Sequence, residues 1–137
     1  MNSEEKNSRL KNHLRRHPEI PFPPEACLFV CDSVFDVLAG LDRPRHISAA
    51  EVLEAVHKRC LREFGVWTGS VMTAWHIHTC RHIGEIIFIL VDSGILSARP
   101  EDRIEDFDVP DATWLRDGGA PALPEEPPKW KGAPLDR

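Results

Sequence analysis

The chain contains no tyrosine and no uncharged apolar run of the roughly 18 residues that a membrane-spanning helix needs. The first absence removes one of the common acid–base side chains, and the second argues against a membrane span. Residues 1–20 also lack the apolar segment of a secretory signal peptide. We therefore expect a soluble, cytoplasmic protein with no membrane partner.

Sequence signatures of catalysis and nucleotide binding are missing as well. The chain has no P-loop, no G-x-G-x-x-G, no G-x-S-x-G and no H-E-x-x-H motif. The acidic stretch 101–111 has neither the glycine nor the ligand order of an EF-hand loop. These absences favour a protein that is not an enzyme, with no catalytic residue, no cofactor and no bound metal.

Charge is distributed unevenly along a chain whose net charge is −5. Residues 1–21 hold five Lys and Arg against three Glu, whereas residues 98–117 hold three basic against seven acidic residues. An acidic balance without an extended basic face argues against a dedicated nucleic-acid binder, whose affinity comes mainly from phosphate neutralisation. We interpret residues 1–21 as a basic, flexible N-terminal arm.

The C-terminal residues 118–137 differ in composition from the rest of the chain. They contain five prolines and three glycines and little apolar content, which predicts a disordered tail. A single folded domain then covers residues 22–117. Within the tail, Trp130 lies between two lysines and is a candidate anchor for a protein partner, although an idle chain end is the alternative.

Apolar spacing and capping signals predict a mainly α domain of four helices. Ser48 and Glu51 form a capping box, Gly65 and Gly94 are stop signals, and prolines at 23 and 24 suit a first helical turn. The expected helices are at about 24–41, 48–64, 67–75 and 80–93. A short β element near 97–109 would complete a winged-helix-like arrangement. Trp67 and Trp75 are expected on one buried face.

A run of alternating histidine and cysteine spans the start of the last of these helices. A straight strand would spread the run over about 20 Å, too far for one zinc ion, whereas a helix beginning at Thr79 brings only two histidines near each other. Cysteines four residues apart in the first helix offer a second half-site. Whether either set binds metal stays open, and polar helix-start residues and buried thiols are the favoured interpretation. The residues concerned are His76, His78, Cys80 and His82, and Cys27 and Cys31.

The order of motifs resembles a small family of conserved hypothetical proteins from planctomycete and verrucomicrobial genomes. The resemblance covers about residues 22–115 and rests on the segments RHISAAEVLEAV, EFG, IGEIIFILVDSGIL and EDRIEDFDV. In such proteins mostly charged or small residues precede the Gly-Glu-Ile motif, where this chain has the histidine and cysteine run. The resemblance implies the extent of the domain and no known activity, and no catalytic residue is carried over.

Three classes of function are compatible with these patterns. A non-catalytic protein-interaction or adaptor domain with a protein partner is favoured, because the tail and the acidic segment suit partner contact. A helix-turn-helix-like protein that binds nucleic acid or the ribosome is the alternative, since a short helix precedes the 80–93 helix. A metal-binding protein or an enzyme is the third.

Overall fold

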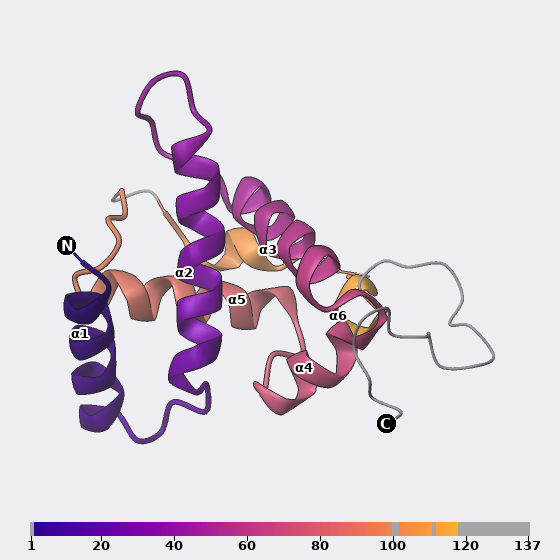
Figure 1. The fold of residues 1–137 in the computed structure, drawn as a ribbon, viewed down its shortest axis with the longest axis horizontal. Coiled ribbons are helices and arrows are strands. Elements are labelled where there is room, and N and C mark those ends of the chain that lie inside the picture. Colours follow the sequence, from indigo (N-terminus) through magenta and orange to yellow (C-terminus); the bar gives the residue numbers. More distant parts are fainter. Residues whose placement is uncertain (1, 100–101, 111, 118–137) are drawn as a thin grey trace, which may run out of the picture.

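The computed structural model describes residues 2–99, 102–110 and 112–117 of the 137-residue chain. Within these residues the protein is mainly helical and contains no strand, which confirms the expected class. Figure 1 shows the arrangement of its α-helices. The elements are α1 (Ser3–Arg16), α2 (Pro24–Ala39), α3 (Ala49–Glu63), η1 (Gly65–Trp67), α4 (Thr68–Ala74), α5 (Cys80–Asp92), η2 (Ile104–Phe107) and α6 (Trp114–Asp117).

Helix α5 is the centre of the fold. It crosses behind α2, and it also contacts α1, α3 and η2 (Figure 1). Ile83, Ile86 and Leu90 repeat at helical spacing and are fully buried. They pack into one core with the buried faces of α2 and α3, including Val30 and Val56. The apolar run of the sequence is therefore the helix on which the other elements assemble.

The predicted helix ends are confirmed where local signals defined them. The Ser48 hydroxyl accepts the backbone N–H of Glu51, and the Glu51 carboxylate accepts that of Ser48. At the end of α5, Gly94 has a positive φ of 80°. The N–H of Gly94 donates to the carbonyl of Val91, and that of Ile95 to the carbonyl of Leu90, as a Schellman ending requires.

The N-terminal arm differs from the expectation, because residues 3–16 form helix α1 and pack on the domain. Leu10 is fully buried and His13 nearly so, and α1 runs antiparallel to α2 and contacts it (Figure 1). Asn2 caps the helix through the N–H of Glu5. The buried face of α1 is narrow and is surrounded by charged residues, so it was not recognised in the sequence. The arm is therefore part of the core assembly.

The segment around Trp67 requires a correction. A 3₁₀ turn, η1, precedes a short α4, and Trp67 is 43% exposed, so it does not share a buried face with Trp75. Trp75 packs against Phe29 and Phe64, with ring centroids 5.3 and 5.8 Å away. A 3₁₀ turn has three residues per turn, so it changes the phase at which the following α-helical residues point. The four-helix description thus becomes six helices within the described residues.

The expected β element near 97–109 is wrong. The described residues 97–99 and 102–109 of this segment contain the 3₁₀ turn η2 and no strand. Phe107 is 6% exposed and packs onto α5, which anchors the acidic segment across the domain. Asp108 forms an ion pair with Arg81 of α5, in which the Nη1 atom of Arg81 lies 2.7 Å from Oδ2 of Asp108. No wing is formed by these residues, so the winged-helix-like arrangement is not observed either.

Two further expectations concern the membrane and the tail. Among the described residues, no helix combines the length and the apolarity that crossing a bilayer demands. The predicted disordered tail, residues 118–137, lies outside the described residues.

Candidate binding cleft

A cleft of about 510 Å³ opens beside the central helix. It lies between the second half of α2, the start of α3, the second half of α5 and the chain from Ile95 to Phe107. The segment that follows the Schellman ending of α5 forms one wall, and the loop before α3 forms the opposite wall. The cleft therefore exists because residues 95–98 and the η2 region lie beside α5.

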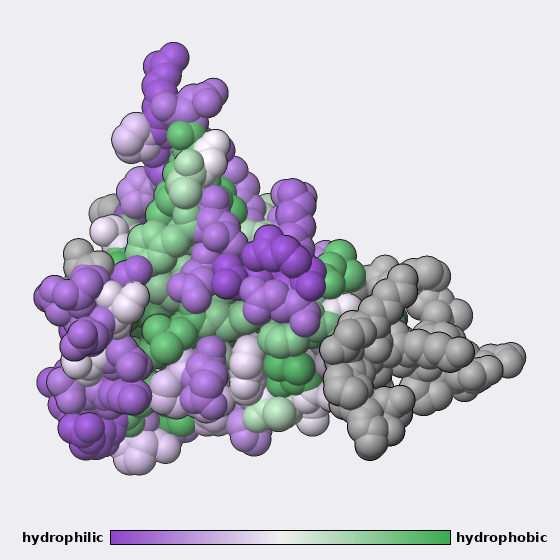
Figure 2. Space-filling model, in the orientation of Figure 1, coloured by the Kyte–Doolittle hydropathy of each residue, from purple (hydrophilic) through white to green (hydrophobic). Residues whose placement is uncertain are grey.

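Apolar side chains form most of the lining of the cleft. Several of these side chains are only partly buried, namely Leu38 of α2, Ile87 and Val91 of α5, and Leu96 after α5. Figure 2 shows a band of apolar surface along α2, between the hydrophilic surfaces of α1 and α3. Partly exposed apolar side chains gathered in a concave site are typical of a binding surface.

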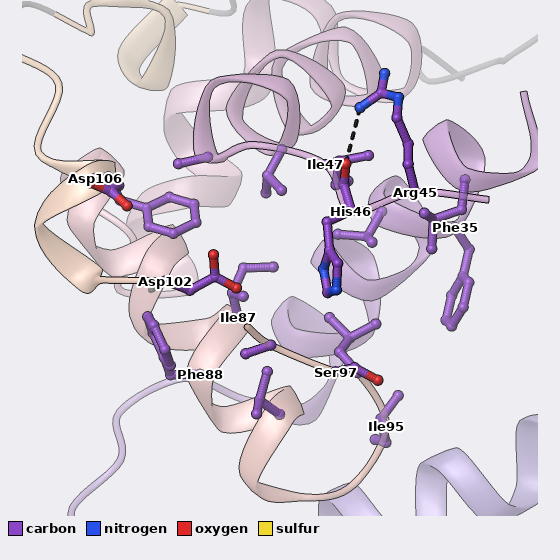
Figure 3. Close-up of a pocket in the computed structure, with 18 of the residues that line it drawn as sticks. Phe35, Arg45, His46, Ile47, Ile87, Phe88, Ile95, Ser97, Asp102 and Asp106 are labelled. Atoms are coloured by element: carbon purple, nitrogen blue, oxygen red, sulfur yellow. Dashed lines mark hydrogen bonds between the residues drawn. The ribbon is translucent and has the colours of Figure 1, made fainter. Parts of the chain in front are cut away.

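Two polar side chains extend into the cleft from opposite walls. In Figure 3, the imidazole of His46 and the carboxylate of Asp102 both point into the space between the walls. One Asp102 oxygen accepts the backbone N–H of Arg99 at 2.7 Å, which fixes the side chain. The two groups can orient a ligand that is otherwise held by apolar contact.

Arg45 holds the His46 wall in place. Its guanidinium donates to both carboxylate oxygens of Glu51, at 3.1 and 2.8 Å, and to the carbonyl of His46 at 3.0 Å. In Figure 3 the Arg45 side chain extends away from the cleft. The hydrogen bond from Arg45, together with the backbone N–H of Ser48, lowers the pKa of Glu51 from its ordinary value of 4.5 to about 2. Arg45 thus links the cleft wall to the capping box.

This lowered pKa predicts a pH dependence. Because Glu51 has a lower pKa in the folded than in the unfolded chain, its ionised form stabilises the fold above its ordinary value of 4.5. That stabilisation is lost as the pH falls from 4.5 towards about 2. We expect Arg45→Gln to lower the melting temperature at pH 7 and the difference from the natural chain to shrink over this interval. Thermal unfolding from pH 7 to pH 2 measures it, with the exposed Arg43→Gln as control, and a pH-independent difference would contradict it.

The histidine run has a structural role at the start of α5. The Thr79 hydroxyl accepts the N–H of His82, and the Nδ1 atom of His82 accepts the N–H of His78 at 2.9 Å and that of Thr79 at 3.3 Å. A neutral imidazole that accepts at Nδ1 carries its proton at Nε2, so neither nitrogen of His82 offers a lone pair to a metal. Among the described residues, no cluster of three potential ligands is placed to hold a metal ion.

We expect His82→Ala to lower the free energy of unfolding by about 1 kcal/mol, because two backbone N–H groups lose their acceptor. His82→Gln should retain most of the stability, since glutamine at the third helical position also completes a capping box. Urea denaturation compares the two variants. If glutamine costs as much as alanine, the ring contributes instead through its edge contact with Phe22, whose centroid lies 5.7 Å away.

The cysteines are core residues. Cys27, Cys31 and Cys60 are fully buried, Cys80 is 2% exposed, and all four are free thiols, as the sequence predicted. Burial raises the pKa of Cys27 and Cys60 to about 12, and that of Cys31 to about 11. Burial raises the pKa of Cys80 as well. At neutral pH these groups are protonated thiols, which are poor nucleophiles and poor metal ligands.

The helix-turn-helix alternative would place α5 in a DNA groove as the recognition helix. Here α5 is enclosed by other elements, because α1, α2, α3 and η2 all contact it. A recognition helix needs a solvent-exposed face that can reach the bases. The packing around α5 therefore does not favour its use as a recognition helix for nucleic acid.

Comparison with protein-family models, with characterised proteins and with solved structures finds no match to this chain. The resemblance over residues 22–115 therefore stays a prediction. Of the residues that line the cleft, sequence reasoning identified none as a site. The one signal available was Gly84, a glycine inside an apolar helix, which indicates close packing against another segment. That segment is the one carrying Phe107.

Proposed function

We propose that the protein is a non-catalytic interaction domain that binds an apolar segment of a partner protein in the cleft. The observation that supports this most directly is the cleft itself, about 510 Å³ in volume and lined by partly exposed apolar side chains. The hydrogen bonds of Arg45 with Glu51 and of Asp102 with the Arg99 N–H hold the two walls in place. Little conformational entropy is therefore lost when a ligand binds. A cytoplasmic location accords with four free cysteine thiols.

The proposal extends to the kind of segment that would bind. A cleft with an apolar floor and two polar groups at its walls suits a short peptide that inserts one or two large apolar side chains. Such an anchor side chain would lie against Ile87 and Val91, while a backbone or side-chain polar group meets His46 or Asp102. A contact of this size fits a reversible, regulated interaction rather than an obligate one.

Site-specific photo-crosslinking in the native cell tests this function. A photoreactive residue replaces Ser97, which lies exposed on the cleft wall, and crosslinked partners are identified by mass spectrometry. We expect a discrete crosslinked partner that disappears with Ile87→Lys, which places a charge in the cleft. The partner should persist with Leu61→Lys, a matched change at a side chain 43% exposed on α3 and outside the cleft. Crosslinks unaffected by Ile87→Lys would contradict the proposal.

A further inference from the structure

The cleft wall that contains Ala98, Asp102 and Phe107 carries carboxylates that have no ion-pair partner among the described residues. Asp102 and Asp106 line this wall together with one cation, Arg103, so its acids outnumber its bases, and neither carboxylate forms an ion pair within the described residues. The cation of the opposite wall, Arg45, is already held by Glu51 at 2.8 Å. Residues 98–117, which include this wall, hold seven acidic and three basic residues. An occupant with an apolar body and flanking positive charge therefore complements the cleft best.

The chain itself carries one segment with that chemistry. Residues 118–137 continue beyond α6 and contain Trp130 between Lys129 and Lys131. An indole is the side chain with the largest apolar area to bury, and it can be accommodated by a cleft of about 510 Å³. The two flanking ammonium groups equal the two carboxylates of the wall in number and are opposite to them in sign.

The position of α6 allows this segment to reach the cleft of the same molecule. Trp114 of α6 stacks on His57 of α3, with ring centroids 4.5 Å apart. His57 is five residues from Val52, which lines the cleft, and this corresponds to about 8 Å along the helix. The chain from Asp117 to Trp130 can extend over about 43 Å. The tether is thus long enough to cross α3 and enter the cleft with length to spare.

We propose that Lys129–Lys131 of the same molecule docks in the cleft, with Trp130 against the apolar floor and the lysines facing Asp102 and Asp106. This inference rests on the proposed function of the cleft and adds its regulation. The tether raises the local concentration of the segment to the millimolar range, so a weak contact suffices to occupy the site. A partner segment binds only after displacing the chain's own tryptophan.

Disulfide trapping in the full chain tests the docking. Ser97→Cys on the cleft wall is combined with Gly132→Cys, which leaves Lys129–Lys131 intact, and oxidation is followed on non-reducing gels. The four natural cysteines are at most 2% exposed and react slowly by comparison. The control pairs Gly132→Cys with Lys58→Cys, an exposed position beside His57 and hence nearer the start of the tail. Circular dichroism of each reduced variant verifies that it is folded.

We expect the Ser97→Cys pair to form a monomeric disulfide about tenfold faster than the control pair, because docking raises the effective concentration at the cleft. Adding Trp130→Ala, or Asp102→Asn with Asp106→Asn, should remove this excess. Equal rates in the two pairs, or an excess that survives Trp130→Ala, would overturn the docking. A disulfide-linked dimer would overturn it in favour of a second copy. A negative result here leaves the photo-crosslinked partner in place, so the two proposals fail separately.

Discussion

Gly84→Ala is expected to lower the free energy of unfolding by about 2 kcal/mol, although alanine is the better helix former by roughly 1 kcal/mol. The reason is the contact with Phe107. A Cβ atom at position 84 would lie 2.6 Å from two atoms of the Phe107 ring, well inside van der Waals contact. Phe107 is buried between the helix and the rest of the fold, so the ring cannot move aside without opening the acidic segment.

The measurement is thermal unfolding, in which a loss of this size lowers the melting temperature by roughly 10 °C for a domain of about 100 residues. Gly40→Ala is the matched control, because a Cβ there would meet only backbone oxygens at 3.6 and 3.7 Å and the φ of −89° suits alanine. Gly84→Ala with Phe107→Leu should cost less than the sum of the two single changes. Strict additivity would show that the ring is not the obstacle.

The same contact explains why the cleft was not predicted from the sequence. Helix ends depend on residues within one turn, so the capping box at Ser48 and the Schellman ending at Gly94 were readable directly. The cleft depends on the packing of η2 against α5, which is a contact between segments that are separated in the sequence. Because the segment that contains η2 is acidic in composition, its buried residue Phe107 could not be recognised from the sequence as a core residue.

The histidine run was only partly predictable for a different reason. Thr79 was readable as an N-cap, and His78 was correctly placed before the helix. A capping box usually has Glu or Gln at its third helical position, so no sequence pattern indicated that role for His82. The Nδ1 atom of His82 accepts two backbone N–H groups, so this nitrogen is not available as a metal ligand.

Gly69→Ala is expected to detach α6 from the domain. A Cβ atom at position 69 would overlap the carbonyl oxygen of Arg116, and backbone cannot rotate out of the way as a side chain can. Leu115 is 4% exposed in this packing, and Trp114 stacks on His57. Exposing a buried leucine costs about 2 kcal/mol, so we expect detachment of α6 to cost a free energy of this order.

Hydrogen exchange and tryptophan fluorescence together measure the detachment. Amides of 114–117 should lose protection while those of α5 keep it, and the emission of Trp114 should change as the imidazole of His57 leaves its face. Ser70→Ala, at the neighbouring exposed position of α4, should leave both signals unchanged. Because residues 118–137 begin at the end of α6, Gly69→Ala should also slow the disulfide trapping between Ser97→Cys and Gly132→Cys. Unchanged protection of 114–117 would mean that α4 shifts instead, and that α6 is held chiefly by the Trp114 stack.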